Sequence, residues 1–335
     1  EKRYVMSRVR DEMERSRGIV PEAAMQEYER ALGYYDSLTP YDDSGQIAAA
    51  ARTSSGDTLD RWLDNMIVDH RFNLDEVRRA TGMSTKDANA AIKKRVDDVP
   101  RSGFRILPYP GGRHPRIGFL DGALRPQRET KVSVFPPWTD GGYVVVDVPE
   151  AVFSNLGLTY LAHQHIPTLW DDIGVTLPQR EWKATSNGWS MKRVLPNGIV
   201  IESNVVEQDR AARMSLTLTN GTDEKLTGLR VQVCVMLKGA IGFNTQHAHE
   251  TVIVEPFIAV RAENQNRWII TAWTPNHRAW TNPPVPCLHS DPIFPDCDPG
   301  QSVSVSGGLW FYQGNDIRVE LDRLSQSNLP GFPIK

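Results

Sequence analysis

The spacing of hydrophobic residues changes along the chain near residue 100. Before this point, apolar side chains in the segment 57–70 recur three or four positions apart, which is the period of an amphipathic helix. These side chains are Leu59, Trp62, Leu63, Met66 and Ile67. Pro21 stands at a position that suits the first turn of another helix. The first hundred residues are therefore predicted to be helical.

After about residue 130, the chain shows short runs of β-branched and aromatic residues that turn signals separate. Several runs alternate polar and apolar positions, as half-buried antiparallel strands do. No amphipathic helix of useful length lies between them, which argues against a parallel sheet. The predicted strands are 131–135, 143–148, 190–195, 198–206, 212–220, 229–237, 250–254, 267–273, 302–307, 309–313 and 316–321.

A segment rich in Pro and Gly, 100–116, separates the two patterns. A chain of 335 residues also exceeds the usual length of one domain. We therefore expect an α+β protein with two domains. The first is a small helical accessory domain over residues 1–103, and the second is a large antiparallel β-sandwich over residues 104–335.

The segment 73–96 resembles a helix-turn-helix. It contains a helix, a Thr-Gly-Met turn and a second helix that Ser84 or Thr85 caps. Residues 1–105 carry nearly equal numbers of basic and acidic side chains, whereas a DNA-reading module needs positive charge against the phosphates. We therefore expect these helices to have a packing role, and nucleic acid is not favoured as a partner.

The stretch 214–237 has the pattern of a strand, an Asn-Gly turn and a long strand. The positions that define this pattern are Leu216, Leu218, Asn220, Thr222, Leu226 and Leu229. The pattern resembles the hairpin of galactose-mutarotase-like β-sandwich proteins, which process carbohydrates. The resemblance implies a sandwich fold and a saccharide ligand, although the catalytic His and Glu of that family do not align with residues of this chain.

Composition narrows the class of protein only slightly. With 40% hydrophobic and 24% charged residues, the chain is ordinary for a globular protein, and no apolar stretch approaches the roughly 20 residues that a membrane span requires. A net charge of −3 without a basic stripe provides no attraction for a polyanion. Because the chain begins at Glu1, we expect that a leading segment was removed. A secreted or periplasmic location is favoured, with the cytoplasm as the alternative.

Three cysteines are too few for a disulfide framework. Cys234 lies within an apolar run and is expected to be a small buried side chain. Cys287 and Cys297 bracket a Pro-rich stretch, and an oxidising compartment would allow them to form a disulfide that closes this loop.

Half of the eight histidines occur in two His-x-His pairs, His163 with His165 and His247 with His249. Side chains two positions apart in a strand point to the same face, so each pair presents two imidazoles to one metal ion or one substrate. Imidazoles suit divalent ions such as zinc, manganese or iron. We therefore predict one divalent metal that these four histidines hold, with His163 and His165 also as catalytic residues. Solvated surface histidines are the alternative.

The segment 277–300 lacks a strand pattern and is predicted to be a long ordered loop. It contains His289 and Asp291 among apolar residues. We expect His289 to act as a general acid or base, with Asp291 as a catalytic partner that orients it. A loop that caps one end of the sandwich is the alternative.

Three tryptophans and two arginines are candidates for substrate binding. Trp138, Trp170 and Trp280 stand near Pro, Gly, Asn or Asp, and exposed indoles stack on the C–H surfaces of sugars. Arg125 and Arg128 are expected to bind the carboxylate of an acidic sugar through paired hydrogen bonds. Core packing of the tryptophans and solvated ion pairs of the arginines are the alternatives.

These observations predict, first, a carbohydrate-active enzyme with a saccharide substrate and with His-based acid–base or metal-assisted chemistry. A lyase, an isomerase and a hydrolase all fit this description. The second hypothesis is a glycan-binding protein without catalytic activity. The third is a ligand-sensing DNA-binding regulator. The oligomeric state stays open.

Overall fold

The computed structural model describes residues 57–98, 103–116, 129–162, 168–247, 249–263, 265–283 and 285–327, together with a few positions before residue 31. The helices that the sequence predicts in the first 56 residues therefore lie largely outside the described residues. Across the described part of the chain, no helix has the length and apolar character needed to cross a membrane.

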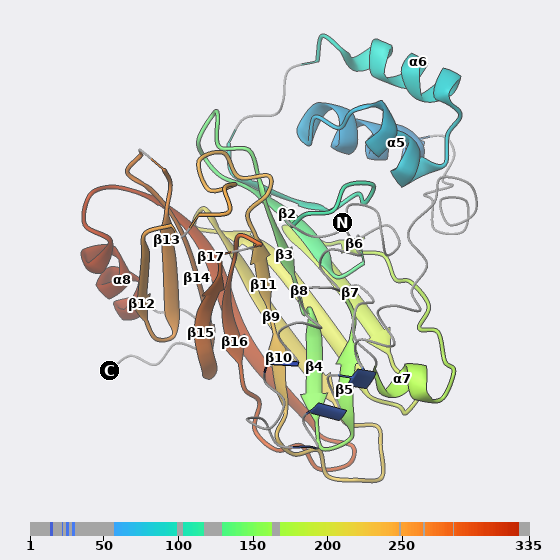
Figure 1. The fold of residues 1–335 in the computed structure, drawn as a ribbon, viewed down its shortest axis with the longest axis vertical. Helices are drawn as coiled ribbons and strands as arrows, with labels where there is room; N and C mark the ends of the chain where they lie inside the picture. Colours follow the sequence, from blue (N-terminus) through green and yellow to red (C-terminus); the bar gives the residue numbers. More distant parts are fainter. Residues whose placement is uncertain are drawn as a thin grey trace.

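Two large sheets form most of the structure (Figure 1). The first has six strands in the order β1-β2-β3-β11-β16-β15. Its strands are β1 (Arg105–Pro108), β2 (Lys131–Phe135), β3 (Val144–Asp147), β11 (Cys234–Met236), β15 (Asn276–Asn282) and β16 (Cys287–Pro292). Neighbouring strands in this sheet run antiparallel.

The second sheet has eight antiparallel strands in the order β12-β13-β14-β17-β9-β8-β7-β6. Its strands are β6 (Lys183–Ala184), β7 (Gly188–Val194), β8 (Val200–Gln208), β9 (Ala211–Thr219), β12 (Thr251–Val254), β13 (Phe257–Arg261), β14 (Arg267–Thr274) and β17 (Ser302–Gln313). A third, small sheet consists of β4 (Ala151–Ser154), β5 (Gly157–Tyr160) and β10 (Arg230–Gln232).

The main hydrophobic core combines the inward faces of the two large sheets. Every second residue of β9 is buried, which assigns Met214, Leu216 and Leu218 to this core. Val144 and Val146 of β3 belong to the same core. The alternation follows from the two-residue period of a strand. The expectation of a large, mostly antiparallel β-rich unit is confirmed.

Four short helical segments cover part of the outer face of the six-stranded sheet. They are α4 (Asp57–Leu63), the π-helix η1 (Asp64–Asp69), α5 (Leu74–Thr81) and α6 (Thr85–Arg95). Met66 of η1 and Val77 of α5 share one buried cluster with Tyr143 and Val145 at β3. The helices and the sheet therefore bury each other's apolar surface. The domain boundary between residues 103 and 104 stays a prediction.

The two helices within 73–96 begin and end at local signals. Asn73 accepts the backbone N–H of Glu76 at 3.0 Å, and the Glu76 carboxylate accepts the N–H of Asn73 at 2.8 Å. Gly82 ends α5 in the left-handed region with φ of 71°. Ser84 then accepts the N–H of Asp87 at 3.1 Å and starts α6, as the sequence predicts.

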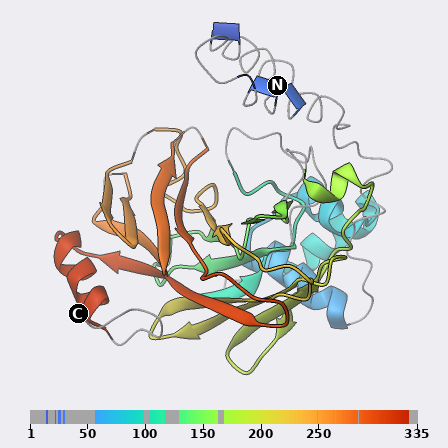
Figure 2. The same ribbon diagram turned by 90° about the horizontal axis from the view of Figure 1, so that it is seen from below.

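Helix α8 (Ile317–Gln326) packs on the outer face of the eight-stranded sheet, on the opposite side of the molecule from α5 and α6 (Figures 1 and 2). The predicted strand 316–321 is therefore wrong. Its apolar residues alternate as in a strand, but the buried residues Ile317, Leu321 and Leu324 follow the spacing of one helix face. Asp316 caps this helix by accepting two backbone N–H groups.

Three further predictions about the β region are wrong. The segment 277–300 is not a loop, because it contains most of β15 and all of β16. The predicted strand 229–237 is divided at Val233, so that β10 joins the small sheet and β11 the large one. The predicted strands 302–307 and 309–313 form the single strand β17, in which Gly307 leaves room for the ring of Trp273.

Candidate functional site

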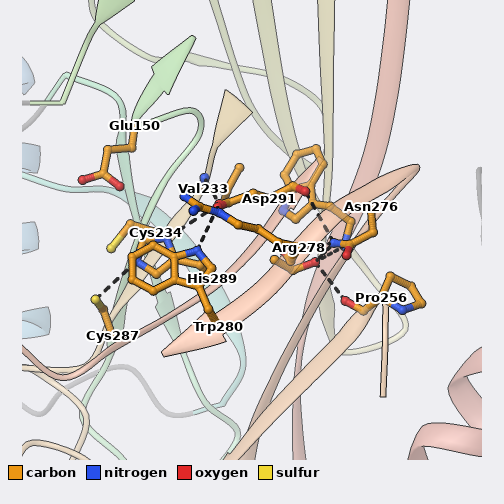
Figure 3. Close-up of polar contacts among 12 residues, drawn as sticks. Glu150, Val233, Cys234, Pro256, Asn276, Arg278, Trp280, Cys287, His289 and Asp291 are labelled. Carbon is orange, nitrogen blue, oxygen red and sulfur yellow. Dashed lines mark hydrogen bonds and ion pairs between the residues drawn. The ribbon is translucent and has the colours of Figure 1, made fainter. Parts of the chain in front are cut away.

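A row of buried polar side chains lies on the outward face of β16. Cys287, His289 and Asp291 occupy alternate positions of this strand and therefore point to the same face. The strand register places Cys234 of β11 opposite His289 on one side and Trp280 of β15 opposite it on the other. The side chain of His289 is only 1% exposed, and the neighbouring thiols and carboxylate are buried as well. These five residues form the β16 cluster (Figure 3).

The imidazole of His289 is held on three sides. Its Nε2 atom lies 3.4 Å from Sγ of Cys287, and its Nδ1 atom lies 3.7 Å from Oδ1 of Asp291. The ring of Trp280 stacks on it with a centroid separation of 4.0 Å and an interplanar angle of 6°. The imidazole orientation is thus determined by packing as well as by polar neighbours.

Asp291 is in turn fixed by three donors. The backbone N–H of Val233 donates to Oδ1 at 3.0 Å, while Trp280 Nε1 and Arg278 Nε donate to Oδ2 at 2.9 and 2.8 Å. Burial alone would raise the pKa of Asp291, but His289, Trp280 and Arg278 lower it below its usual range. Asp291 is therefore a carboxylate at neutral pH that lies beside the imidazole, and its role as a catalytic partner stays a prediction.

A second buried group adjoins the β16 cluster. Glu150, which is fully buried, accepts hydrogen bonds from Arg116 and from the hydroxyl of Tyr160. Arg116 Nη2 also donates to Sγ of Cys234 at 3.1 Å. Burial alone would raise the pKa of Glu150, but Arg116 and His289 hold it at about 2. Glu150 therefore carries a negative charge beside the thiols.

The charges around His289 determine its protonation. Burial alone would lower the pKa of His289, but Cys234, Asp291 and Glu150 raise it to about 10. Burial raises the pKa of the Cys234 thiol, so that the neutral thiol dominates at neutral pH. In this protonation state the cluster holds an imidazolium between carboxylates, and the imidazolium is able to donate a proton. With the thiols deprotonated, the same side chains provide soft metal ligands.

A separate groove lies between α4–η1 and the edge formed by β1, β6 and β7. Its volume is about 440 Å³. Its aromatic walls are Trp62, Trp182 and Trp189, and its polar lining includes Arg61, Asp64 and Asn65. The indole of Trp189 donates to the carbonyl of Ile106 at 2.9 Å, and Asn65 Nδ2 donates to the carbonyl of Pro108 at 3.0 Å, so two of the walls are fixed to β1.

A small pocket of about 50 Å³ reaches the β16 cluster. Cys287 lines this pocket together with His247, His249 and Thr281. One of the two predicted histidine pairs therefore lines the same small pocket as a cysteine of the cluster, which the sequence does not predict.

The remaining predicted residues have varied positions. His163, His165, Arg125 and Arg128 lie outside the described residues. His289, Asp291 and Trp280 come together as described above. Trp138 stacks on Phe243 at 6.3 Å between ring centroids. Trp170, in the short helix α7 (Leu169–Asp172), is buried in the main core and donates to Thr159 Oγ1 at 3.1 Å.

Sequence reasoning missed several residues of these sites. Cys234, Arg116 and Glu150 belong to segments far from β16 in the chain, and no local pattern connects them. One signal was present: Cys287, His289 and Asp291 alternate, which is the period of a strand.

All three cysteines are free thiols, and Cys297 belongs to the main core while Cys287 faces the helices. The disulfide between Cys287 and Cys297 is therefore not formed.

No protein-family model matches the chain, and no curated protein matches its sequence. Among solved structures, a polysaccharide lyase is 14% identical, with 65% of this chain and 34% of that chain covered and a TM-score of 0.34. Heparan sulfate lyase HepC from Pedobacter heparinus is 10% identical, with 94% and 52% covered and a TM-score of 0.31. A protein described as a kojibiose phosphorylase from the human microbiome is 7% identical, with 54% and 25% covered and a TM-score of 0.33.

These three neighbours are carbohydrate-processing enzymes by their descriptions, and this chain spans between a quarter and about half of their lengths. At TM-scores this low, the likeness carries no argument about the activity of this chain.

Proposed function

We propose that this protein binds a saccharide in the groove between α4–η1 and the six- and eight-stranded sheets. The observation that carries the proposal is a groove of about 440 Å³ with three tryptophans in its lining. A volume of this size is in the range of small-molecule sites, which cover roughly 300–1,000 Å³. Indole faces stack on the C–H surfaces of sugar rings, and the polar residues between them suit the hydroxyl groups.

The polar lining supports a saccharide with an acidic group. Arg61 is exposed at the groove, and among the described residues it donates one long side-chain hydrogen bond, of 3.4 Å to Thr58, so its guanidinium is available to a carboxylate or sulfate. Asp64 accepts a hydrogen bond of 2.6 Å from Arg95, which compensates much of its negative charge. The groove therefore does not repel an anionic ligand at this position.

The test is a binding measurement on the full chain with a panel of neutral and acidic oligosaccharides, followed by calorimetry on any ligand found. Replacing Trp62 or Trp189 by Ala should weaken binding roughly fivefold, since an aromatic contact contributes on the order of 1 kcal/mol. Trp138→Ala is the matched control, because Trp138 is also partly buried but lies outside the groove. Arg61→Gln should weaken the binding of acidic oligosaccharides more than the binding of neutral ones.

Two outcomes would contradict the proposal. One is that the wild-type protein binds no oligosaccharide of the panel. The other is that Trp62→Ala and Trp189→Ala bind as tightly as Trp138→Ala, which would place the ligand elsewhere on the molecule.

A second candidate function is catalysis on a saccharide, as a lyase, an isomerase or a hydrolase, at the β16 cluster and not in the groove, which His289 does not line. The observation that favours it is the imidazole of His289 between Asp291 and the Cys287 thiol, which suits acid–base chemistry. In that case His289→Gln should abolish turnover while saccharide affinity of the groove is kept. The catalytic roles of His163 and His165 and the substrate contacts of Arg125 and Arg128 stay predictions, and His165→Ala tests the first of them in the same assay.

A further inference from the structure

We infer that Cys234, Cys287 and His289 form a binding site for a thiol-seeking divalent metal ion, and that zinc is the ion it takes. The two sulfur atoms and one ring nitrogen of His289 all lie within 4.8 Å of one another. They come from two neighbouring strands, β11 and β16, whose register places Cys234 directly opposite His289. Rigid sheet geometry therefore holds the three ligand atoms together (Figure 3).

The distances suit a tetrahedral zinc site after a small contraction. With Zn–S near 2.3 Å and Zn–N near 2.0 Å, neighbouring ligand atoms in such a site stand about 3.5–3.8 Å apart. Cys287 Sγ and His289 Nε2 are already 3.4 Å apart. The other separations are at most 4.8 Å, so side-chain rotations of about 1 Å bring the sulfur atoms into range.

The surroundings of His289 provide an independent indication of a metal site. Histidines that bind a metal through one ring nitrogen almost always direct the other toward a carboxylate, a carbonyl or water. In His289, Nε2 faces the thiol of Cys287 while Nδ1 faces Asp291 Oδ1 at 3.7 Å. The three donors to Asp291 fix that carboxylate in place. A shift of less than about 1 Å would let Nδ1 donate to Asp291, as in a metal-bound histidine.

The side chains around Cys234 stabilise a thiolate once a cation is bound. Arg116 Nη2 donates to Cys234 Sγ at 3.1 Å, and a hydrogen bond from a guanidinium stabilises a thiolate. Two thiolates with Glu150 and Asp291 carry four negative charges, against the two positive charges of Arg116 and Arg278. A divalent cation would balance this buried cluster, and the two thiol protons together with the extra proton of the His289 imidazolium would leave to solvent when it binds. A zinc-bound His289 would then not act as the general acid or base of the second candidate function.

A small pocket adjoins one ligand residue of this site. Cys287 lines this pocket together with His247, His249 and Thr281. Two thiolates and one imidazole select zinc over calcium, magnesium or manganese, which prefer oxygen ligands. Three protein ligands leave a fourth position for water, which is typical of zinc sites that act on a substrate.

The experiment measures zinc in the full chain after metal removal, reconstitution with zinc chloride and desalting. We expect one zinc per chain in the wild type and the same in Cys297→Ser. The zinc affinity should fall at least tenfold in each of the three ligand variants, Cys234→Ser, Cys287→Ser and His289→Gln. Cys297→Ser is the matched control because Cys297 is a buried free thiol in the other core. Asp291→Asn should keep the site but lower its affinity for zinc roughly 10–100-fold.

A measurement on the wild type remains decisive if the ligand variants do not fold. Bound zinc should protect Cys234 and Cys287 from alkylation but leave the reactivity of Cys297 unchanged, and cobalt in place of zinc should show the absorption of a thiolate complex. Failure of the reconstituted wild type to bind zinc would overturn the inference. Full zinc binding in Cys287→Ser would overturn it as well, since the ion would then lie elsewhere. Neither result depends on saccharide binding in the groove.

Discussion

Acid should destabilise this protein through His70, a histidine that the helices bury against the six-stranded sheet. His70 follows η1 and is only 2% exposed. Its Nδ1 atom donates to the carbonyl of Asn65 at 2.8 Å, and its Nε2 atom accepts from the hydroxyl of Ser133 at 2.7 Å. Both ring nitrogens of the neutral imidazole are therefore satisfied, and aromatic rings such as Tyr143, at 4.5 Å between centroids, surround them.

The neutral form is strongly preferred in the folded protein. Burial, together with the positive charges of Arg113 and Arg105, lowers the pKa of His70 to about 3, although the hydrogen bond to Asn65 opposes this lowering in part. In the unfolded chain, a histidine has a pKa near 6.5. Between these two values the unfolded state binds more protons than the folded state, so stability falls as the pH falls.

The magnitude follows from the two pKa values. One pKa unit corresponds to about 1.4 kcal/mol, so lowering the pH from about 7.5 to about 5 should remove roughly 2 kcal/mol of unfolding free energy through His70. The full difference, on the order of 5 kcal/mol, is reached only below about pH 3. A typical protein has an unfolding free energy of about 5–15 kcal/mol, so the loss of roughly 2 kcal/mol between pH 7.5 and 5 is readily measured.

The assay is urea unfolding at several pH values for the wild type and His70→Gln. For each protein, the free energy of unfolding is plotted against pH. Subtracting the curve of His70→Gln from that of the wild type removes the contributions of other titrating groups. The difference should change by roughly 2 kcal/mol between pH 7.5 and 5. His277→Gln, at an exposed histidine, is the control and should keep the wild-type pH dependence. Parallel curves for the wild type and His70→Gln would refute the reasoning, because they would show that His70 does not remain neutral in the folded state.

Two further predictions concern stability. Lys131→Met should cost about 3–5 kcal/mol in urea unfolding, because it leaves the fully buried Asp147 without the ammonium that lies 2.9 Å from its Oδ1. The double variant with Asp147→Leu should recover part of this loss, and no recovery would mean that packing rather than charge is responsible. Asn73→Ala should cost about 1 kcal/mol through loss of the α5 cap, and an unchanged midpoint would show that Glu76 alone is sufficient.

The two-residue and 3.6-residue periods predicted most of the elements, since they depend on neighbours in the chain. Helix ends were also predictable where a cap such as Ser84 is local. The hydrophobic period did not assign the correct element in short segments. Residues 316–321 fit both periods, and only the burial of Leu321 and Leu324 on the eight-stranded sheet selects the helix. The segment 277–300 contains prolines at the ends of its strands, which concealed β15 and β16.

The sequence by itself determined the helical and antiparallel β-rich parts, and it indicated His289, Asp291 and Trp280 as chemically interesting residues. Tertiary structure alone decided their partners. Cys234 meets His289 only because β11 pairs with β16, across 55 residues of chain, and Glu150 reaches the same place through the Arg116 guanidinium. The groove likewise needs Trp62 from a helix and Trp189 from a strand. Strand pairing and helix docking bring together residues that are distant in sequence, and no local periodicity encodes that proximity.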